Sequence, residues 1–308
     1  MLTVSNYHYI RSDFKSKYQS IFGLTPNEFK NQLLLLQKDG SFIKPNDLVV
    51  SGNEILESKE NYLLITFDDG LKEQFDLALP ILDELNIPAI FFINSVNHIE
   101  KKVSLVHQIH LVRSVISSKE LYENLEKHTN RKLSQLEIQK AHQFYRFDNP
   151  ESAELKYFLN VLLDFDNQEK FINSIFTKNF DVDEVLESLY MNTNEIKQLI
   201  KRDYIGSHTH NHLPLGIYDE KTIIHELETT KKYLEHLGGK PIDCVAYPYG
   251  TKEAATEEVG KLAKQVGYKV GFTTNLGINK GDSNKLLLDR FDCNDLIGGK
   301  NHHKIYKW

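Results

Sequence analysis

The sequence predicts an α/β fold with a barrel-like parallel sheet and one long helical insertion. Two apolar runs, residues 62–67 and 89–94, enclose an amphipathic segment at 75–85, which is the pattern of a parallel βαβ unit whose strands are buried on both faces. Strands and helices alternate again in the last third of the chain, whereas the part between has helical spacing and almost no strand signal. We therefore expect a single α/β domain over 1–308, interrupted by a helical insertion at about 98–200.

The composition is that of an ordinary globular protein, with 40% hydrophobic and 26% charged residues among 308. A formal net charge of −6 argues against a nucleic-acid or anionic-membrane partner. No apolar run approaches the length of a membrane span, and residues 1–6 have neither the basic flank nor the apolar core of a signal peptide. We therefore expect a cytoplasmic protein with no transmembrane segment, in which Cys244 and Cys293 are reduced, buried thiols.

The N-terminal elements follow from their local sequence. Residues 2–10 form a strand-like segment. A helix is predicted to begin at Thr25, because a threonine side chain can cap the first turn and Glu28 would complete a capping box. Residues 42–43 suggest a short strand, and 44–47, which contain a proline, suggest a turn. The buried central strand of the βαβ unit follows.

The C-terminal elements repeat the alternation of strand and helix. Gly238-Gly239 and Gly267 follow two amphipathic segments and stand where glycine commonly ends a helix. The predicted elements are, in order, a strand at 204–207, a helix at 221–237, a strand and turn at 244–250, a helix at 254–266, and strands at 268–274 and 286–293.

Two adjacent carboxylates stand at the C-terminal end of the central strand. Side chains on a strand alternate between its faces, so Asp68 and Asp69 can share one site only where the strand turns into a loop, and Gly70 supplies that turn. Two carboxylates repel each other, so we expect a positive group, most simply a metal ion, to neutralise them. The alternative is an Asp-Asp-Gly turn that merely ends a strand, and such turns are common.

Three histidines follow the predicted strand at 204–207, and the C-terminal ends of parallel strands meet at one face of the sheet. The i, i+4 spacing of His208 and His212 would place both imidazoles on one side of a helical turn, where they suit a shared metal. With one carboxylate they would leave open positions for water, as catalytic metal sites do. Ligation by His208, His210 and His212 from a strand is the alternative; we prefer the first arrangement, with His210 pointing away.

The segments 66–70, 208–212 and 247–250 resemble, in this order, three motifs of the polysaccharide deacetylases, carbohydrate esterase family 4. Thr-Phe-Asp-Asp-Gly resembles the first motif, His-Thr-x-x-His the second, metal-binding motif, and Tyr-Pro-Tyr-Gly the third. Their strand-end positions agree as well, and together they cover most of the chain outside the insertion. The resemblance implies a distorted (β/α) barrel, a divalent metal, usually zinc, and hydrolysis of an acetamide on a sugar.

The resemblance also assigns roles to residues of these motifs. It implies that Asp68 is the catalytic base. It implies that Asp69 binds the metal together with His208 and His212. The backbone N–H of Tyr249 would then stabilise the oxyanion that forms when the acetyl carbonyl is attacked.

The third motif departs from the family pattern. It often begins with an arginine that orients the base, and here Ala246 holds that position. Tyr247 and Pro248, which follow, are expected to contact the substrate. Asp289 and Arg290, on the last predicted strand, are candidates to supply the missing partner near the base, although a purely structural ion pair explains them equally well.

The residue expected to act as general acid also lies at a different position in the sequence than in many family members. The Leu-x-His segment that carries it in many family members is absent after Leu286. The poly-N-acetylglucosamine deacetylases have a permuted arrangement, in which this histidine lies on an N-terminal Tyr-His strand. Residues 4–8, Val-Ser-Asn-Tyr-His, fit this variant, so the resemblance implies that His8 is the general acid and lies close to the metal site.

The predicted function is the metal-dependent removal of an acetyl group from an N-acetylated sugar or glycan, in surface polysaccharide metabolism, with Zn²⁺ as the cofactor. Two alternatives stay open. One is an O-acetyl esterase or other small-amide hydrolase with the same site, and the other is a catalytically inactive carbohydrate-binding protein. The missing arginine favours inactivity, whereas a base kept beside a set of metal ligands argues against it. Metal-dependent release of acetate separates an enzyme from a binding protein.

Overall fold

The computed structural model describes residues 1–15, 23–146 and 148–302. The chain forms two compact units. The first contains the whole sheet and is made of residues 1–13, 22–102 and 186–308. The second is helical in its described part and is made of residues 14–21 and 103–185.

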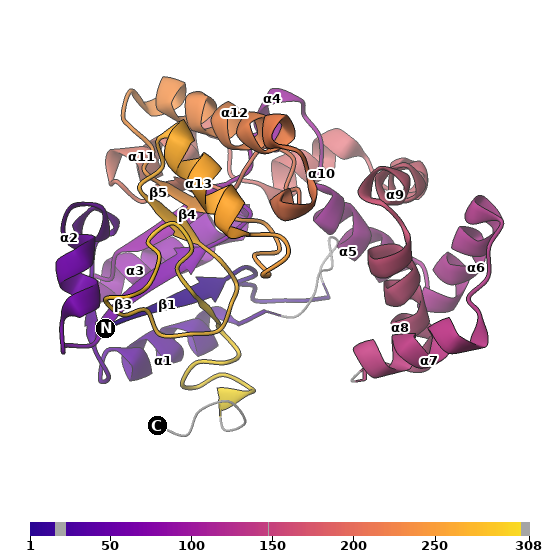
Figure 1. Ribbon diagram of the computed structural model, residues 1–308, viewed down its shortest axis with the longest axis horizontal. Helices are drawn as coiled ribbons and strands as arrows, with labels where there is room; N and C mark the ends of the chain where they lie inside the picture. The colour runs from indigo at the N-terminus through magenta and orange to yellow at the C-terminus, as the bar shows by residue number, and fades with distance from the viewer. Residues whose placement is uncertain (16–22, 147, 303–308) are drawn as a thin grey trace. The chain divides into compact units, whose positions relative to one another are not determined.

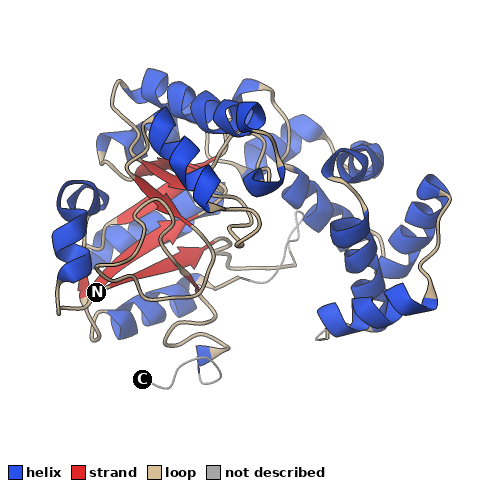
Figure 2. Cartoon of the chain, viewed as in Figure 1, coloured by secondary structure: helices blue, strands red, loops and turns tan. Residues whose placement is uncertain are grey.

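The strands of the described residues form one sheet, and every pairing of strands in it is parallel (Figure 2). The order across the sheet is β7-β6-β5-β4-β3-β1-β8, and β2 pairs with β3 beside this path. The strands are β1 (Leu2–Tyr7), β2 (Ser41–Phe42), β3 (Tyr62–Phe67), β4 (Ala89–Ile93), β5 (Ile205–Ser207), β6 (Cys244–Ala246), β7 (Val270–Phe272) and β8 (Phe291–Asp292).

The last segment of the chain nearly closes this sheet into a barrel. Leu288 forms a parallel bridge with Phe272 at the end of β7, and Phe291 in β8 pairs with Ser5 in β1. The segment between these contacts spans the gap between the two edges of the sheet, so the predicted distorted (β/α) barrel is confirmed. The strand predicted at 286–293 is shorter than expected, because a segment that crosses from one edge to the other pairs with each over only a few residues.

Helices lie around the strands (Figure 1), and most of them pack against the outer face of the curved sheet. Side chains such as Phe29, Leu82 and Leu227 join the strand residues there in one hydrophobic cluster. These helices are α1 (Pro26–Leu36), η1 (Gln74–Ala78), α3 (Leu79–Leu85), α11 (Thr193–Lys201), α12 (Glu220–Gly238) and α13 (Glu257–Val266), while α4 (Val96–Ile99) and the short η3 (Leu215–Ile217) lie in loops after β4 and β5. The predicted capping box of Thr25 and Glu28 begins α1.

The predicted turn after β2 is instead the start of helix α2 (Pro45–Glu57). Its proline lies in the first turn, where the missing N–H needs no partner, and Asp47 accepts a hydrogen bond from the Lys44 N–H at 3.0 Å. A proline followed by an acidic residue suits both a turn and a helix start. The burial of Leu48 and Ile55 against the sheet favours the helix, and this depends on the tertiary structure.

The alternation of side chains along β3 separates the core into two clusters. Leu63 and Ile65 pack with the helices, whereas Leu64 packs inside the barrel with residues of the other strands. Thr66 continues this inner face, because its hydroxyl accepts a hydrogen bond at 3.2 Å from Arg290, whose side chain is fully buried. The inner face of β3 therefore leads directly to Asp68.

The second unit is built from helices in its described part. They are α5 (Leu105–Val115), α6 (Ser118–Thr129), α7 (Gln135–Phe144), α8 (Pro150–Tyr157), η2 (Phe158–Leu162) and α9 (Phe165–Asn179), and α10 (Val182–Leu189) leads out of it. Buried aromatic and aliphatic side chains such as Leu125, Phe158 and Phe176 form their contacts. Several aromatic residues of this part of the chain, among them Tyr157, Phe158 and Phe171, therefore form helix–helix core, whereas Phe144 is 72% exposed and Phe147 lies outside the described residues.

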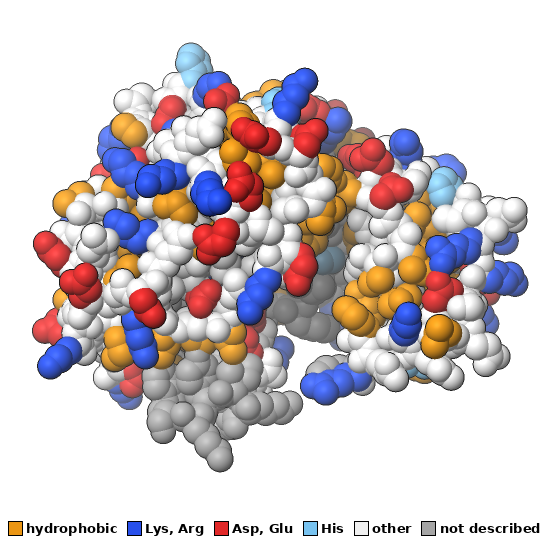
Figure 3. Space-filling view, in the orientation of Figure 1, with side chains coloured by type: hydrophobic (Ala, Val, Ile, Leu, Met, Phe, Trp, Pro, Cys, Tyr) orange, Lys and Arg blue, Asp and Glu red, His pale blue; other side chains and the backbone are white. Residues whose placement is uncertain are grey.

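The surface charges and the two cysteines are arranged as the composition predicts. On the face drawn in Figure 3, acidic and basic side chains are interspersed. Across the described ranges, the structure contains no helix with the length and apolar character needed to cross a membrane. Both cysteines are free and buried, and burial raises the pKa of the Cys244 thiol to about 12.

Candidate active site

The ends of four strands bring the predicted site residues together. β1 and β3 pair in register up to their last residues, so His8 and Asp68, the next residues along the chain, leave the sheet side by side. His208 directly follows β5, and Tyr249 lies in the turn after β6. Because all these strands are parallel, their C-terminal ends lie at one edge of the sheet, as the sequence predicts.

Asp69, His208 and His212 form the one group of potential metal ligands in the part of the chain that the structure describes. All three are buried, and one ligand atom of each lies within 4.8 Å of the others. Nε2 of His208 is 3.5 Å from Asp69 Oδ1, and Nε2 of His212 is 3.3 Å from the same oxygen. Catalytic zinc sites commonly bind the ion through two imidazole nitrogens and one carboxylate oxygen. Asp69, His208 and His212 offer this set of ligand atoms, so they fit a divalent ion.

The ring of His208 is held in the orientation that a shared ion requires. Its Nδ1 lies 2.8 Å from the backbone oxygen of Ala246 at the end of β6, so Nδ1 donates there and Nε2 faces Asp69. Burial acts to lower the pKa of His208, but the charges of Asp68 and Asp69 outweigh it and raise the pKa. This part of the site therefore favours positive charge.

The loop between the two histidine ligands is not the helical turn that their spacing suggested. Thr209 and His212 have left-handed φ angles of 63° and 60°, and Asp69 and Tyr249 have φ angles of 77° and 60°. Half of the described non-glycine residues with positive φ thus lie at this site. Such conformations cost about 1–3 kcal/mol each and persist where the surroundings hold them, commonly at functional sites. The imidazoles converge because of this loop geometry and not because they share a helix face.

Gly70 permits the turn that separates the two adjacent carboxylates. Its φ is 64°, and a Cβ at this position would lie 2.8 Å from Cδ1 of Ile93. Asp68 continues the inner face of β3, while Asp69 is turned toward the histidines. The Asp-Asp-Gly sequence is therefore part of the site and more than the end of a strand.

His210 supports the loop and does not belong to the ligand group. Its Nδ1 lies 2.7 Å from Ser95 Oγ, and its Nε2 lies 2.9 Å from Glu100 Oε1. The ring is buried, and its two nitrogens are directed at residues that follow β4. The sequence-based choice of His208 and His212 over His210 agrees with this geometry.

Two further residues fix the same loop, and the sequence analysis missed both. Nδ2 of Asn94, at the end of β4, donates to the backbone oxygens of His208 and Thr209. The buried carboxylate of Glu226 on α12 accepts hydrogen bonds from the backbone N–H and the side-chain amide of Asn211, both at 2.7 Å. A glutamate on an amphipathic helix is normally a surface residue, so no local signal identifies Glu226.

Asp68 is paired with Arg290 inside the barrel. Nη1 and Nη2 of Arg290 donate to the two carboxylate oxygens at 2.8 and 2.7 Å, and Nε donates to the Thr273 backbone oxygen at 2.8 Å. Burial favours the neutral acid, but the charge of Arg290, with a further contribution from His208, lowers the pKa of Asp68 to about 2. Asp68 is therefore ionised at neutral pH, and Arg290 provides the guanidinium that position 246 lacks.

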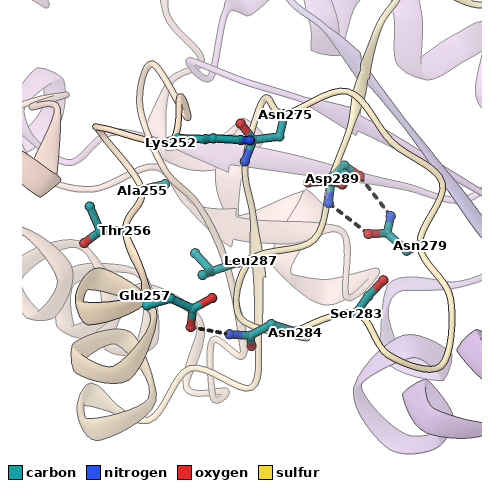
Figure 4. A pocket seen from close by; sticks show the side chains of 10 residues that line it. All are labelled: Lys252, Ala255, Thr256, Glu257, Asn275, Asn279, Ser283, Asn284, Leu287 and Asp289. Carbon is teal, nitrogen blue, oxygen red and sulfur yellow. Dashed lines mark hydrogen bonds between the residues drawn. The ribbon is translucent and has the colours of Figure 1, made fainter.

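Asp289, the neighbour of Arg290, lies in a different environment. Its backbone N–H and C=O are bound by the side-chain amide of Asn279, both at 2.9 Å, and its side chain lines a cavity of about 460 Å³ (Figure 4). The cavity is lined by Lys252, Ala255, Thr256, Glu257, Asn275, Asn279, Ser283, Asn284, Leu287 and Asp289. Neither Asp68 nor any of the three metal-ligand candidates belongs to this lining. Of the two candidates on the predicted last strand, Arg290 alone contacts Asp68.

His8 lies beside Asp68. Its Nε2 is 4.0 Å from Asp68 Oδ2, and 35% of its side chain is exposed. The parallel register of β1 and β3 brings the two residues together, although they are far apart in the sequence. The His8 imidazole is therefore accessible from solvent next to the Asp68 carboxylate.

Tyr249 borders the metal-ligand group. Its ring centroid is 5.2 Å from that of His212, and 41% of the residue is exposed. The Thr274 hydroxyl donates to the Tyr249 backbone oxygen at 2.7 Å, which holds the turn after β6. The backbone of this left-handed residue is thus fixed next to the site.

Tyr247 is directed into the core, contrary to the prediction that it contacts the substrate. It is fully buried in the cluster between sheet and helices, and its hydroxyl donates to the Leu286 backbone oxygen at 2.9 Å. Pro248 is buried as well, and its contact with substrate stays a prediction. Of these motif residues, Tyr249 has an exposed side chain next to the ligand candidates.

Known proteins resemble the chain in sequence and in fold. The family model for polysaccharide deacetylase matches residues 56–142 and 148–271. No curated protein matches the chain. Three solved structures are similar to it, and each match covers 94% of this chain. The Streptococcus pyogenes deacetylase PplD, in complex with acetate, is 16% identical, with 90% of its chain covered and a TM-score of 0.53. IcaB from Ammonifex degensii is 18% identical, with 90% of its chain covered and a TM-score of 0.52, and a de-N-acetylase from Aggregatibacter actinomycetemcomitans is 15% identical, with 94% covered and a TM-score of 0.53. At these identities the similarity shows the fold.

Proposed function

Because this chain belongs to the polysaccharide deacetylase family, whose members are hydrolases of N-acetyl amide bonds, we propose that it removes the acetyl group from an N-acetylated sugar or glycan at a divalent-metal site. The observation that carries the proposal is the buried group of Asp69, His208 and His212 next to the ionised Asp68. A carbohydrate-binding protein has no use for a base beside metal ligands. A role in surface polysaccharide metabolism stays a prediction from the sequence.

Asp69, His208 and His212 would hold the ion, and their donor set suits Zn²⁺. When bound, such an ion polarises the acetyl carbonyl and lowers the pKa of the attacking water. The chain supplies the geometry: the Ala246 carbonyl orients one imidazole, and His210 holds the loop that carries both. These contacts set the ligands before substrate arrives, which lowers the reorganisation needed during the reaction.

Asp68 would take the proton from the attacking water. Its lowered pKa keeps it ionised at neutral pH, and the two hydrogen bonds from Arg290 prevent the carboxylate from rotating. Each carboxylate oxygen can accept a second hydrogen bond, so pairing with the guanidinium does not prevent proton transfer. A weak base suffices where the water itself is acidified.

His8 would protonate the amine that leaves, since an unprotonated amine is a poor leaving group. Its position 4.0 Å from Asp68 and its exposure of 35% support this role. The backbone N–H of Tyr249 would stabilise the developing oxyanion, together with the positive charge at the ligand group.

The metal site predicts a specific loss in one histidine variant. We expect wild-type protein to contain one divalent ion per chain and to release acetate from an N-acetylated sugar only when this ion is present. His212→Ala removes one of three ligands, so both the metal content and the acetate release should be lost. Elemental analysis of purified protein and an acetate assay over N- and O-acetylated sugars measure this.

His210→Ala is the matched control, because it removes a buried histidine of the same loop whose nitrogens contact Ser95 and Glu100. Because His210 helps to hold this loop, the variant should bind the ion more weakly than wild type but retain far more of it than His212→Ala. Equal metal content in wild type and His212→Ala would contradict the ligand group. Acetate release from O-acetylated substrates alone would favour the esterase alternative.

His8 predicts a dependence on the leaving group. His8→Ala should keep its metal and cleave the N-acetyl amide on the order of 10²-fold more slowly, because the amine is no longer protonated. Hydrolysis of p-nitrophenyl acetate, whose leaving group needs no proton, should change much less. The kcat for both substrates is compared with that of His236→Ala, an exposed histidine on α12. An equal loss on both substrates would exclude His8 as the acid.

A further inference from the structure

Gln74 connects the two loops that carry the proposed acid and the proposed base. Its Nε2 donates to the backbone oxygen of His8 at 2.9 Å and to that of Asp68 at 2.7 Å. The side chain is fully buried. It belongs to η1, a single π-helical turn, in which the Leu79 N–H donates to the Gln74 backbone oxygen. Turns of this kind are rare and are frequent at functional sites.

The orientation of the Gln74 amide follows from its partners. The NH₂ group has two hydrogens, and the two backbone oxygens accept one each. The reversed amide would place its oxygen against two other oxygens, which is repulsive. One side chain therefore ties the end of β1 to the end of β3, beyond the last paired residues of these strands.

The residue before Gln74 fastens the loop after β1 a second time. The carboxylate of Glu73 accepts a hydrogen bond from the Ile10 N–H at 3.1 Å and forms an ion pair with Arg11. The loop that begins with His8 is thus held at two points by consecutive residues, Glu73 and Gln74.

The base depends on Gln74 less than the acid does. The Asp68 carboxylate is fixed by two hydrogen bonds from Arg290, and the Asp68 N–H donates to the Tyr7 backbone oxygen at 3.0 Å. The His8 side chain is one-third exposed and contacts the base at 4.0 Å. Loss of the Gln74 amide should therefore displace His8 more than Asp68.

We propose that Gln74 is a positioning residue that holds the His8 loop against the Asp68 loop, so that the acid and the base keep the separation that amide cleavage needs. This inference rests on the proposed function, since it takes His8 as the acid and Asp68 as the base. It assigns Gln74 no contact with the substrate. Gln74 acts by fixing the position of the His8 imidazole.

Gln74→Met tests the inference, because methionine has a similar volume and no donor. We expect cleavage of the N-acetyl amide to slow by about tenfold or more, while hydrolysis of p-nitrophenyl acetate changes by less than about threefold. The metal content should be unchanged, because the hydrogen bonds of the Gln74 side chain go to backbone oxygens of His8 and Asp68 and not to the side chain of a ligand candidate. The ratio of the amide kcat to the ester kcat is the deciding quantity, since a loss of folded protein would lower both rates equally.

Gln32→Met is the matched control. Gln32 is also a buried glutamine whose Nε2 donates to two backbone oxygens, those of Cys293 at 2.7 Å and Ile297 at 3.0 Å. It should lose at least as much stability, because the Tyr7 hydroxyl also loses its acceptor, Gln32 Oε1, at 2.8 Å. It should keep the wild-type ratio, because Tyr7 stays paired with Phe67 in the sheet. If Gln74→Met does not fold, Gln74→Asn is used, which keeps the amide but is one methylene too short to reach both oxygens.

The possible outcomes distinguish a failure of the positioning role of Gln74 from a failure of the proposed deacetylase function. An unchanged ratio in the Gln74 variants, or the same change of ratio in Gln32→Met, would overturn the positioning role while acetate release by wild type leaves the proposed function standing. Wild-type protein that releases no acetate from any N-acetylated sugar would overturn the proposed function and, with it, the role of Gln74.

Discussion

Replacing Asp68 by asparagine is expected to slow acetate release from an N-acetylated sugar by roughly 10²-fold or more while the protein keeps its metal. Asparagine has nearly the shape of aspartate and can still accept one hydrogen bond from Arg290, but it cannot take a proton from water. The proposed metal ligands Asp69, His208 and His212 are untouched. Metal content and kcat, measured on the same folded preparation, test the expectation.

Asp289→Asn is the control for this variant. Asp289 is a carboxylate of the same segment as Arg290, but it lines the cavity of Figure 4 and does not contact the base. The control should keep its activity to within a small factor. Near-normal turnover in Asp68→Asn would move the base elsewhere, and a large loss in Asp289→Asn would make the cavity a part of the reaction site.

The second large effect concerns Arg290. Arg290→Met leaves the Asp68 carboxylate buried without its cation, and breaking a buried ion pair in this way is expected to lower the free energy of unfolding by about 3–5 kcal/mol. Activity should fall as well, because the base loses both its charge partner and the two hydrogen bonds that fix it. Denaturant unfolding at neutral pH measures the first effect, and acetate release measures the second.

The pH dependence has a defined sign. In the folded wild type the pKa of Asp68 is lowered to about 2, so this carboxylate stabilises the fold above its unfolded pKa, and the contribution is lost as the pH falls through about 2. Without Arg290, burial should instead raise the pKa of Asp68. The variant should therefore be destabilised at neutral pH, where Asp68 is charged, and regain stability when Asp68 takes up a proton. The difference in stability should therefore be largest near neutral pH and shrink on acidification.

The same shift should appear in the activity. In Arg290→Met the acid limb of the profile of kcat against pH should shift to higher pH, because Asp68 is ionised only at higher pH. A difference in stability that does not vary with pH, together with an unmoved acid limb, would show that the guanidinium does not control the charge of Asp68.

Much of the site could be predicted from local sequence. The apolar runs place strands, and a parallel sheet puts the residues after each strand at one edge, which is how Asp69, His208 and His212 were found far apart in the chain. His8 was placed by the resemblance to the permuted deacetylases, from a Tyr-His pair at the end of the first strand, and it lies 4.0 Å from Asp68. The structure brings these residues together because each follows the end of a strand of the parallel sheet, and their chemical roles stay predictions.

Other parts of the site depend on contacts that no local pattern encodes. The sequence marked the segment after β2 as a turn, whereas burial of its apolar residues makes it the start of α2. The histidine spacing suggested a helical turn, whereas left-handed residues at Thr209 and His212 shape the loop. Tyr247 belongs to a family motif but faces the core, because its place on the strand end decides which side of the sheet it meets.

By itself, the sequence determined the βαβ pattern, the strand ends that carry the chemistry and the types of residue that stand there. Only the tertiary structure decided which partners those residues have. Arg290 meets Asp68 because the last segment crosses from β7 to β1 and directs its side chain into the barrel. Gln74 meets the loops of His8 and Asp68 because β1 and β3 pair in register. Pairings between residues that lie far apart in the sequence are set by sheet closure and strand register, and neither leaves a trace in the neighbouring residues.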